Sequence, residues 1–220
     1  MGIRAPLVMS LCLIAAMLAV GAWVWPQIPE TARLAVHWGA DGRPNGYMHR
    51  EAALAIAPLT AAGFTLAFAL IARFGRNIAS SAAAFVAGWL GTLVMLTVAH
   101  FAIAMLARGD AADVPGCTSF IAALFFIVVG NFLGKTRPNS FVGVRTPWSK
   151  KSDAAWDKSN RAAGRMTVAV GLASLAALVT DGAGAARHVL LFGILAMAVI
   201  STVLSYVYYR RDPERREEVP

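Results

Sequence analysis

The chain has 220 residues, of which 58% are hydrophobic and only 15% are charged, and its formal net charge is +8. This composition is far too apolar for a soluble domain of that length, so water-soluble enzymes and soluble nucleic-acid-binding proteins are excluded. The chain is expected to lie in a lipid bilayer.

Six stretches approach or exceed the roughly 18–20 apolar residues that a membrane-spanning helix needs. Trp23 and Trp25 lie at the end of the first stretch, where aromatic rings favour the membrane interface. The sequence therefore predicts an all-α integral membrane protein with six transmembrane helices, at about residues 6–25, 52–72, 82–107, 116–134, 163–180 and 188–209.

The first stretch has an alternative interpretation as a cleaved signal peptide, because Val20 and Ala22 occupy plausible −3 and −1 positions. Its apolar run is long for a signal peptide, and we favour retention of the helix. Cleavage would leave the sidedness of every other segment unchanged.

The distribution of Lys and Arg predicts the orientation, since cytoplasmic segments are enriched in these residues. With the N-terminus inside, 15 of the 20 basic residues fall on the inner side, and the 12 acidic residues divide equally. Both termini are therefore predicted to be cytoplasmic, in a multi-pass protein of the bacterial cytoplasmic membrane. This topology accounts for the positive charge without direct binding of nucleic acid.

Three regions follow from these spans. Residues 1–110 form an N-terminal three-helix membrane region with an ordered extracytoplasmic loop at 26–51. Residues 111–209 form a second three-helix region with a cytoplasmic loop at 135–162, and residues 210–220 form a mobile cytoplasmic tail.

The start of the inner loop has the superficial look of a phosphate-binding loop, because Gly134 precedes Lys135 and Thr136. Only three residues separate Gly130 from Gly134, and the preceding segment is an apolar helix rather than a strand, so nucleotide binding is rejected. The two glycines are better explained by close packing against a neighbouring helix, and Asn131 between them by packing or a polar entry.

Proline and glycine then shape a cationic elbow. Pro138 and Pro147 bias the preceding residues toward extended backbone, and Gly143 permits a turn. Ser152 is a suitable N-cap for a helix beginning at Asp153. Two interpretations of the elbow remain open: it holds anionic lipid headgroups, or Arg137, Asn139, Arg145 and Trp148 form a specific binding surface.

The outer loop contains two consecutive turn signals, so it is expected to be folded. His37, Trp38, Pro44 and Tyr47 provide an aromatic surface suited to lipid headgroups or to a peptide ligand. No metal is expected there, because no cysteine lies near the histidines, and no cofactor is expected anywhere in the chain.

His100 is the one clear ionisable residue at membrane depth. It either makes a hydrogen bond between helices or belongs to a proton-sensitive polar site. The sequence lacks hydrolase motifs and chains of buried acids, so it is not expected to be an enzyme.

At the inner loop, Gly130-Asn131, Gly134-Lys135 and the run RPNSFVGVRTPW are followed by Ser152, Trp156, Asn160-Arg161 and Gly164-Arg165. This pattern resembles the SdpI family of bacterial membrane proteins. The outer-loop pattern is similar to an uncharacterised domain that often precedes the SdpI region. The resemblance adds a cytoplasmic motif formed by Asn131, Lys135, Arg137, Asn139, Arg145, Trp148, Trp156, Arg161 and Arg165.

The resemblance implies immunity to a secreted antimicrobial peptide, with signalling of its presence to a cytoplasmic repressor. The expected partners are membrane lipids, the peptide outside and the repressor inside. The alternative is a small-molecule or lipid transporter, or a lipid-handling membrane enzyme, built around Asn131, His100 and the elbow arginines.

Overall fold

The fold is a bundle of long helices, seen in a computed structural model that describes residues 2–39 and 41–215. Within these residues five helices are long and apolar enough to cross a membrane. They belong to α1 (Arg4–Val24), α2 (Arg50–Phe74), α3 (Ala82–Ala107), α4 (Val114–Leu133) and α6 (Asp153–Arg210). Short 3-10 turns η1 (Trp25–Gln27) and η2 (Ile78–Ser81) and a short helix α5 (Pro147–Lys150) complete the helical elements.

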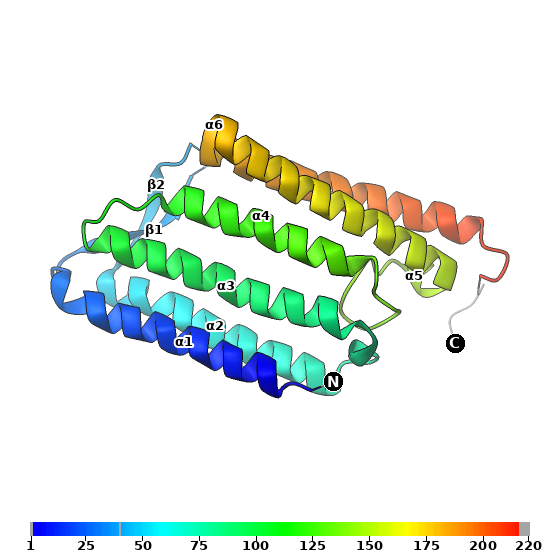
Figure 1. The fold of residues 1–220 in the computed structure, drawn as a ribbon, viewed down its shortest axis with the longest axis horizontal. Coiled ribbons are helices and arrows are strands. Elements are labelled where there is room, and N and C mark those ends of the chain that lie inside the picture. The colour runs from blue at the N-terminus through cyan, green and yellow to red at the C-terminus, as the bar shows by residue number, and fades with distance from the viewer. Residues whose placement is uncertain (1, 40, 216–220) are drawn as a thin grey trace.

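The fifth and sixth predicted spans are the two arms of α6. Gly182 has φ +84° and ψ −177°, which interrupts the helix and reverses its direction. Past this point the arms run side by side (Figure 1), and the Ser174 hydroxyl donates to the carbonyl of Ala186 at 3.1 Å. The structure therefore agrees with the six predicted stretches, although the predicted connection at 181–187 is a break within one long helix.

The large outer side chains agree with a lipid environment. Leu59, Phe192 and Val203 are each more than half exposed, and each lies within a long apolar helix. A water-soluble monomer rarely exposes so extended an apolar surface. Hydrocarbon therefore faces these helices, and the chain is a multi-pass membrane protein.

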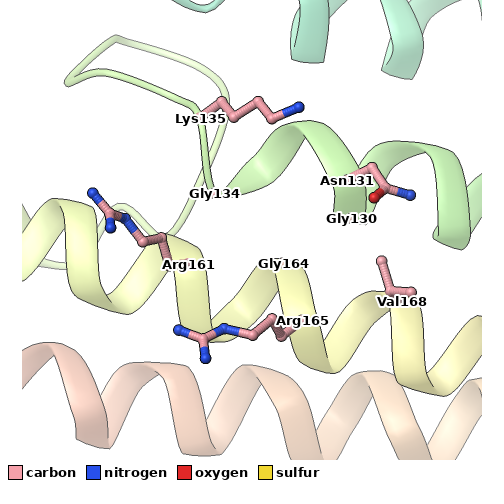
Figure 2. A pocket seen from close by; sticks show the side chains of 8 residues that line it. All are labelled: Gly130, Asn131, Gly134, Lys135, Arg161, Gly164, Arg165 and Val168. Atoms are coloured by element: carbon pink, nitrogen blue, oxygen red, sulfur yellow. The ribbon is translucent and has the colours of Figure 1, made fainter.

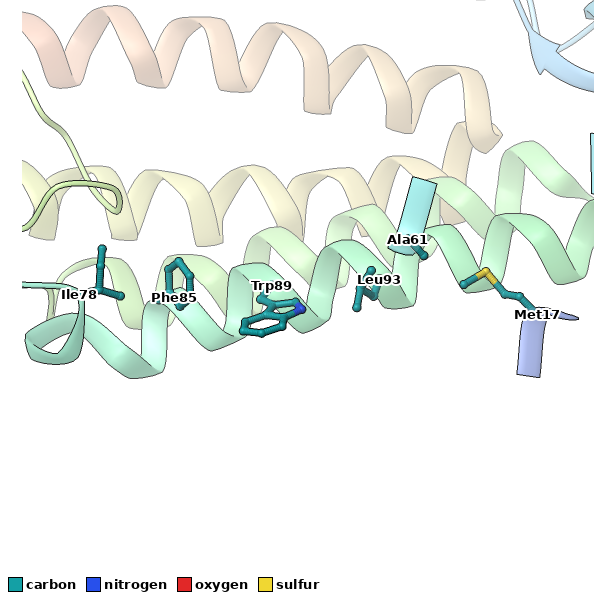
Figure 3. Packing of buried hydrophobic residues seen from close by; sticks show 6 residues of the cluster. All are labelled: Met17, Ala61, Ile78, Phe85, Trp89 and Leu93. Atoms are coloured by element: carbon teal, nitrogen blue, oxygen red, sulfur yellow. The ribbon is translucent and has the colours of Figure 1, made fainter. Parts of the chain in front are cut away.

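One buried hydrophobic cluster of the N-terminal half lies where α1, α2, η2 and α3 meet. Figure 3 shows its six residues, which are Met17, Ala61, Ile78, Phe85, Trp89 and Leu93. The ring of Phe68 stacks on that of Trp89 with centroids 5.7 Å apart. This aromatic cluster extends to Phe141, in the connection between α4 and α5.

The outer loop contains a two-stranded antiparallel hairpin that the all-α prediction missed. Strand β1 (Arg33–Trp38) pairs with β2 (Pro44–His49), with an irregular register around His37. β-Branched residues are scarce in these strands, so the residue pattern gave no strand signal. The pairing also depends on two separate segments of the chain coming together, which a local pattern does not show. The hairpin lies at one end of the bundle, while α5 and the start of α1 lie at the other (Figure 1).

Candidate functional site: the elbow and the hairpin

The elbow consists of residues 135–152, between α4 and α6, at the end of the bundle where α1 begins (Figure 1). Asn139 fixes its first turn. The side-chain oxygen of Asn139 accepts from the backbone N–H groups of Phe141 and Val142 at 2.8 and 2.6 Å. Its amide group donates to the carbonyls of Arg137 and Val142 at 2.8 and 2.9 Å. Asn139 is therefore a structural centre of the loop.

Ser81, in η2, attaches this turn to the N-terminal half. Its hydroxyl accepts from the backbone N–H of Arg137 at 3.0 Å and from the Asn139 side chain at 3.2 Å. The ring of Phe141 adds an apolar contact, because it lies edge-on to Phe85 and Phe68 with centroids 5.7 and 6.1 Å apart. The elbow thus packs on the aromatic cluster of α2 and α3.

The second half of the elbow closes over buried polar side chains of α6. Asn160 is 1% exposed, and its carbonyl oxygen accepts from the N–H of Val144 at 2.7 Å. The indole N–H of buried Trp156 donates to the carbonyl of Thr136 at 3.0 Å. Gly143 has φ +113°, and a Cβ there would lie 2.5 Å from the side-chain oxygen of Asn160. These contacts leave the loop one well-defined conformation.

The elbow ends in α5 and in the start of α6. Thr146 caps α5 by accepting from the N–H of Ser149 at 3.1 Å, and it also bonds Ser205 at 2.7 Å. The predicted cap of α6 is present, since the Ser152 hydroxyl accepts from the N–H of Ala155 at 2.9 Å. The ring of Trp148 lies edge-on to Tyr206, with centroids 5.1 Å apart. Both α6 arms therefore hold the end of the elbow.

Ser152 also binds the start of the C-terminal tail. Its hydroxyl donates to the carboxylate of Asp212, and this hydrogen bond, with a second from the N–H of Glu214, lowers the pKa of Asp212. The rest of the predicted mobile tail, residues 216–220, lies outside the described residues.

The basic residues of the elbow face away from this polar interior. Arg137 forms an ion pair with Asp157 at 3.5 Å, and its side chain remains 68% exposed. Arg145 lies with Arg76 and Lys150 around a cleft of about 330 Å³ that Asn139 and Ser140 also line. This cleft can bind an anionic group at the exposed surface of the elbow.

The remaining predicted residues of the motif lie elsewhere. Asn131, Lys135, Arg161 and Arg165 line a separate cleft of about 340 Å³ between α4 and α6 (Figure 2). There Gly130 packs on Gly164, since a Cβ on either glycine would lie within 2.8 Å of the other's carbonyl oxygen. Of the nine residues of the predicted motif, four therefore line this cleft, and Asn139, Arg145 and Trp156 line the cleft of the elbow. Arg137 and Trp148 line neither of the two.

The hairpin places the predicted outer residues on one small sheet. His37 and Tyr47 are exposed on β1 and β2, and Trp38 is half-buried opposite Pro44. The His37 ring is hydrogen-bonded to the side-chain oxygen of Asn45 at 2.5 Å. Arg187, beyond the break in α6, donates to the carbonyl of Gly39 at 3.2 Å. The hairpin is therefore tied to the C-terminal half.

His100 lies apart from all of these residues. It is 1% exposed, and its Nε2 is 3.0 Å from the carbonyl oxygen of Met17, which joins α3 to α1. It does not line the cleft that contains Asn131.

Sequence reasoning missed Ser81, Phe141 and Asp212 as parts of the site. Ser81 is 56 residues from Arg137 and Asp212 is 60 residues from Ser152, so no local pattern joins them. Asn160 shares a buried face of α6 with Trp156 and Ala163. Its support of the loop could be found only from the fold.

Comparison with known proteins confirms the resemblance at the level of regions. Residues 135–208 match the SdpI/YfhL protein family, and residues 12–61 match a domain of unknown function, DUF1648. A segment of 119 residues, 54% of this chain, is 26% identical to the immunity protein SdpI of Bacillus subtilis strain 168. That segment spans 57% of the relative's length. No solved structure matches the chain.

Proposed function

We propose that this membrane protein, with its SdpI/YfhL region, gives its cell immunity to a secreted antimicrobial peptide. Peptide contact at the hairpin would change how the elbow presents its basic face to a cytoplasmic repressor. The observation that carries this proposal is the elbow itself. The SdpI/YfhL region contributes a loop of fixed shape, and that loop packs on the helices that follow the DUF1648 region.

The hairpin supplies the outer surface of this proposal. Tyr47 is 49% exposed and pairs with Ala35 on β1, two residues before exposed His37. An aromatic surface of this kind favours an amphipathic peptide that enters the membrane interface. The hydrogen bond from Arg187 to Gly39 means that movement of the hairpin reaches α6 directly.

The two halves also meet at the inner end, through Ser81 and Phe141. Because the two halves of the bundle are in contact at both ends, a change at the hairpin has a physical route to the elbow. A peptide that binds one arrangement more tightly than another would shift the population of elbow conformations. Its basic cleft, with Arg76, Arg145 and Lys150, suits an acidic surface on the repressor.

The orientation is part of the proposal. The ends of α1 and α6 that carry Arg4 and Arg210 lie at the same end of the bundle as the elbow (Figure 1). The excess of basic residues at this end supports a cytoplasmic location for it.

The test is survival of a Bacillus subtilis strain that lacks its own SdpI, grown with its peptide-secreting parent. Expression of the full chain should raise survival at least ten-fold over an empty vector. Tyr47→Ala should lose most of this protection, whereas Arg43→Ala, an exposed change at the turn of the same hairpin, should keep it. Equal killing with the empty vector and the intact chain, at matched membrane levels, would remove the immunity proposal.

Signalling is tested separately from protection. Arg137→Ala with Arg145→Ala should leave the hairpin intact and weaken membrane recruitment of the repressor, measured by fractionation after peptide exposure. Unchanged recruitment in this variant would limit the function to immunity.

The transporter or lipid-handling alternative loses support because its proposed polar residues do not meet. Asn131 lies near the inner end of α4, and His100 binds Met17 in the contact between α1 and α3. No function is proposed for a combined site of these two residues.

A further inference from the structure

We propose that the cleft between α4 and α6 is a binding site for an anionic phospholipid. Its basic end would hold the phosphate of the headgroup, and its apolar continuation would hold an acyl chain. This inference is independent of the proposed immunity function, because it uses neither the hairpin nor the basic face of the elbow.

The basic residues that line the cleft are Lys135, Arg161 and Arg165, and Asn131, on α4, lines it one turn before Lys135 (Figure 2). No carboxylate lines the cleft in the described part of the chain. Guanidinium groups bind phosphate oxygens in a directed, two-point geometry, and a lysine adds a point charge. The residue types therefore match a phosphate-bearing headgroup.

These basic groups are poorly neutralised by the protein. Asp157 receives both Arg161 at 3.7 Å and Arg137 at 3.5 Å, so one carboxylate is shared by two guanidinium groups. Lys135 lies over the Phe132 ring at 5.6 Å, and Arg165 has no acidic partner among residues 2–39 and 41–215. An external anion would supply the missing charge.

Depth distinguishes Arg165 from the other basic residues at this end. It lies 12 residues into α6, about 18 Å along the helix from Asp153, at a rise of about 1.5 Å per residue. Figure 2 shows its side chain directed back toward the start of α6, away from the apolar part of the helix. A cation at this depth reaches the headgroup layer by extending its side chain along the helix. The phosphates of the lipids lie in that layer.

The same two helix faces become apolar beyond the basic end. On α4, Val128 is one turn below Asn131 and 47% exposed, and on α6, Leu172 is one turn below Val168 and 54% exposed. Residues three or four apart share a helix face, so these side chains continue the walls of the cleft. A free inorganic anion would gain nothing from such walls, whereas an acyl chain would.

Close packing gives the cleft a fixed base. The contact of Gly130 with Gly164 brings the two backbones together, and Gly134 lies against Arg161, with a Cβ there 3.2 Å from the Arg161 Cα. Lys135 on one segment and Arg161 and Arg165 on the other line the cleft above this base. Its volume of about 340 Å³ is large enough for a phosphate headgroup.

The experiment uses the full chain, purified in a neutral detergent and stripped of lipid. Binding of dioleoyl phosphatidylglycerol, dioleoyl phosphatidylcholine and inorganic phosphate is measured by native mass spectrometry and by the shift in unfolding temperature. Arg161→Gln with Arg165→Gln is compared with Arg4→Gln with Arg211→Gln. The second variant removes the same charge from exposed residues at the same end of the bundle that line neither cleft.

Phosphatidylglycerol should bind the intact chain and the Arg4/Arg211 variant equally, and the Arg161/Arg165 variant about ten-fold or more weakly. Arg161→Lys with Arg165→Lys keeps both charges and should recover most of the binding, which separates charge loss from misfolding. Equal phosphatidylglycerol binding in both glutamine variants would overturn the proposal. Inorganic phosphate that reproduced the full temperature shift would also overturn it, in favour of a free-anion site.

Discussion

The elbow and the hairpin are both short connections at the ends of a helix bundle, but their conformations are fixed in different ways. The elbow is held by side chains, chiefly those of Asn139, Trp156 and Asn160, which are bonded to loop backbone. The hairpin is held by its own backbone ladder, and His37 and Tyr47 remain exposed. Changes in the elbow should therefore affect stability, whereas changes on the hairpin should affect binding.

The comparison first depends on the two regions lying on opposite sides of the membrane, and labelling should give an all-or-none result. The endogenous Cys12 and Cys117 are replaced by Ser, and single cysteines are introduced at Arg43 and Lys150. An impermeant maleimide added to intact cells should label position 43 and leave position 150 unlabelled until the cells are opened. Labelling of both positions in intact cells would contradict the topology.

The next largest effect should come from the glycines with positive φ. Gly143→Ala forces a Cβ to within 2.5 Å of the buried Asn160 oxygen, besides straining φ, so it should destabilise the chain by about 2–4 kcal/mol. Gly42→Ala has the same kind of backbone strain, at φ +78°, but its nearest neighbour is Arg187 Nη2 at 3.8 Å, and it should cost about 1–2 kcal/mol. Unfolding in mixed detergent micelles measures the loss of stability in both variants. Equal losses would mean that the elbow around Gly143 is no more tightly packed than the hairpin around Gly42.

Asparagine replacements sharpen the same contrast. Asn160→Leu leaves the N–H of Val144 without its acceptor in a buried environment, and it should lower the free energy of unfolding by about 2–3 kcal/mol. Asn45→Leu removes an exposed hydrogen bond to His37 on the hairpin and should cost about 0.5 kcal/mol. The same unfolding measurement applies, and a small effect at Asn160 would show that the loop is held by other contacts.

The smallest effect should be the pH dependence of the tail contact. Because the hydrogen bond from Ser152 lowers the folded-state pKa of Asp212, the contact stabilises the fold above the unfolded pKa of about 4 and is lost as pH falls through the folded value. The unfolding temperature of the intact chain should exceed that of Asp212→Asn at pH 7, and the gap should close as the carboxylate is protonated at acidic pH. A gap that widened on acidification would contradict the assigned sign.

Individual residues show how far sequence reasoning reached. Ser152 was predicted as the cap of a helix from Asp153, and the structure has that cap, because capping depends on residues three positions apart. The strands at 33–38 and 44–49 were not predicted, since pairing depends on two segments that only the fold brings together. The predicted motif combined Arg145 with Arg161, which line different clefts, because spacing along the chain does not tell which way a folded loop faces.

The sequence by itself determined that this protein lies in a lipid bilayer and which stretches of the chain cross it. A helix of about 20 apolar residues satisfies its own backbone in hydrocarbon, whatever its neighbours are. Only the tertiary structure decided that Ser81 and Phe141 join the two halves, and that Gly130 meets Gly164 below a basic cleft. Those contacts join residues at least 34 positions apart in the chain, and their stability depends on packing that no local pattern encodes.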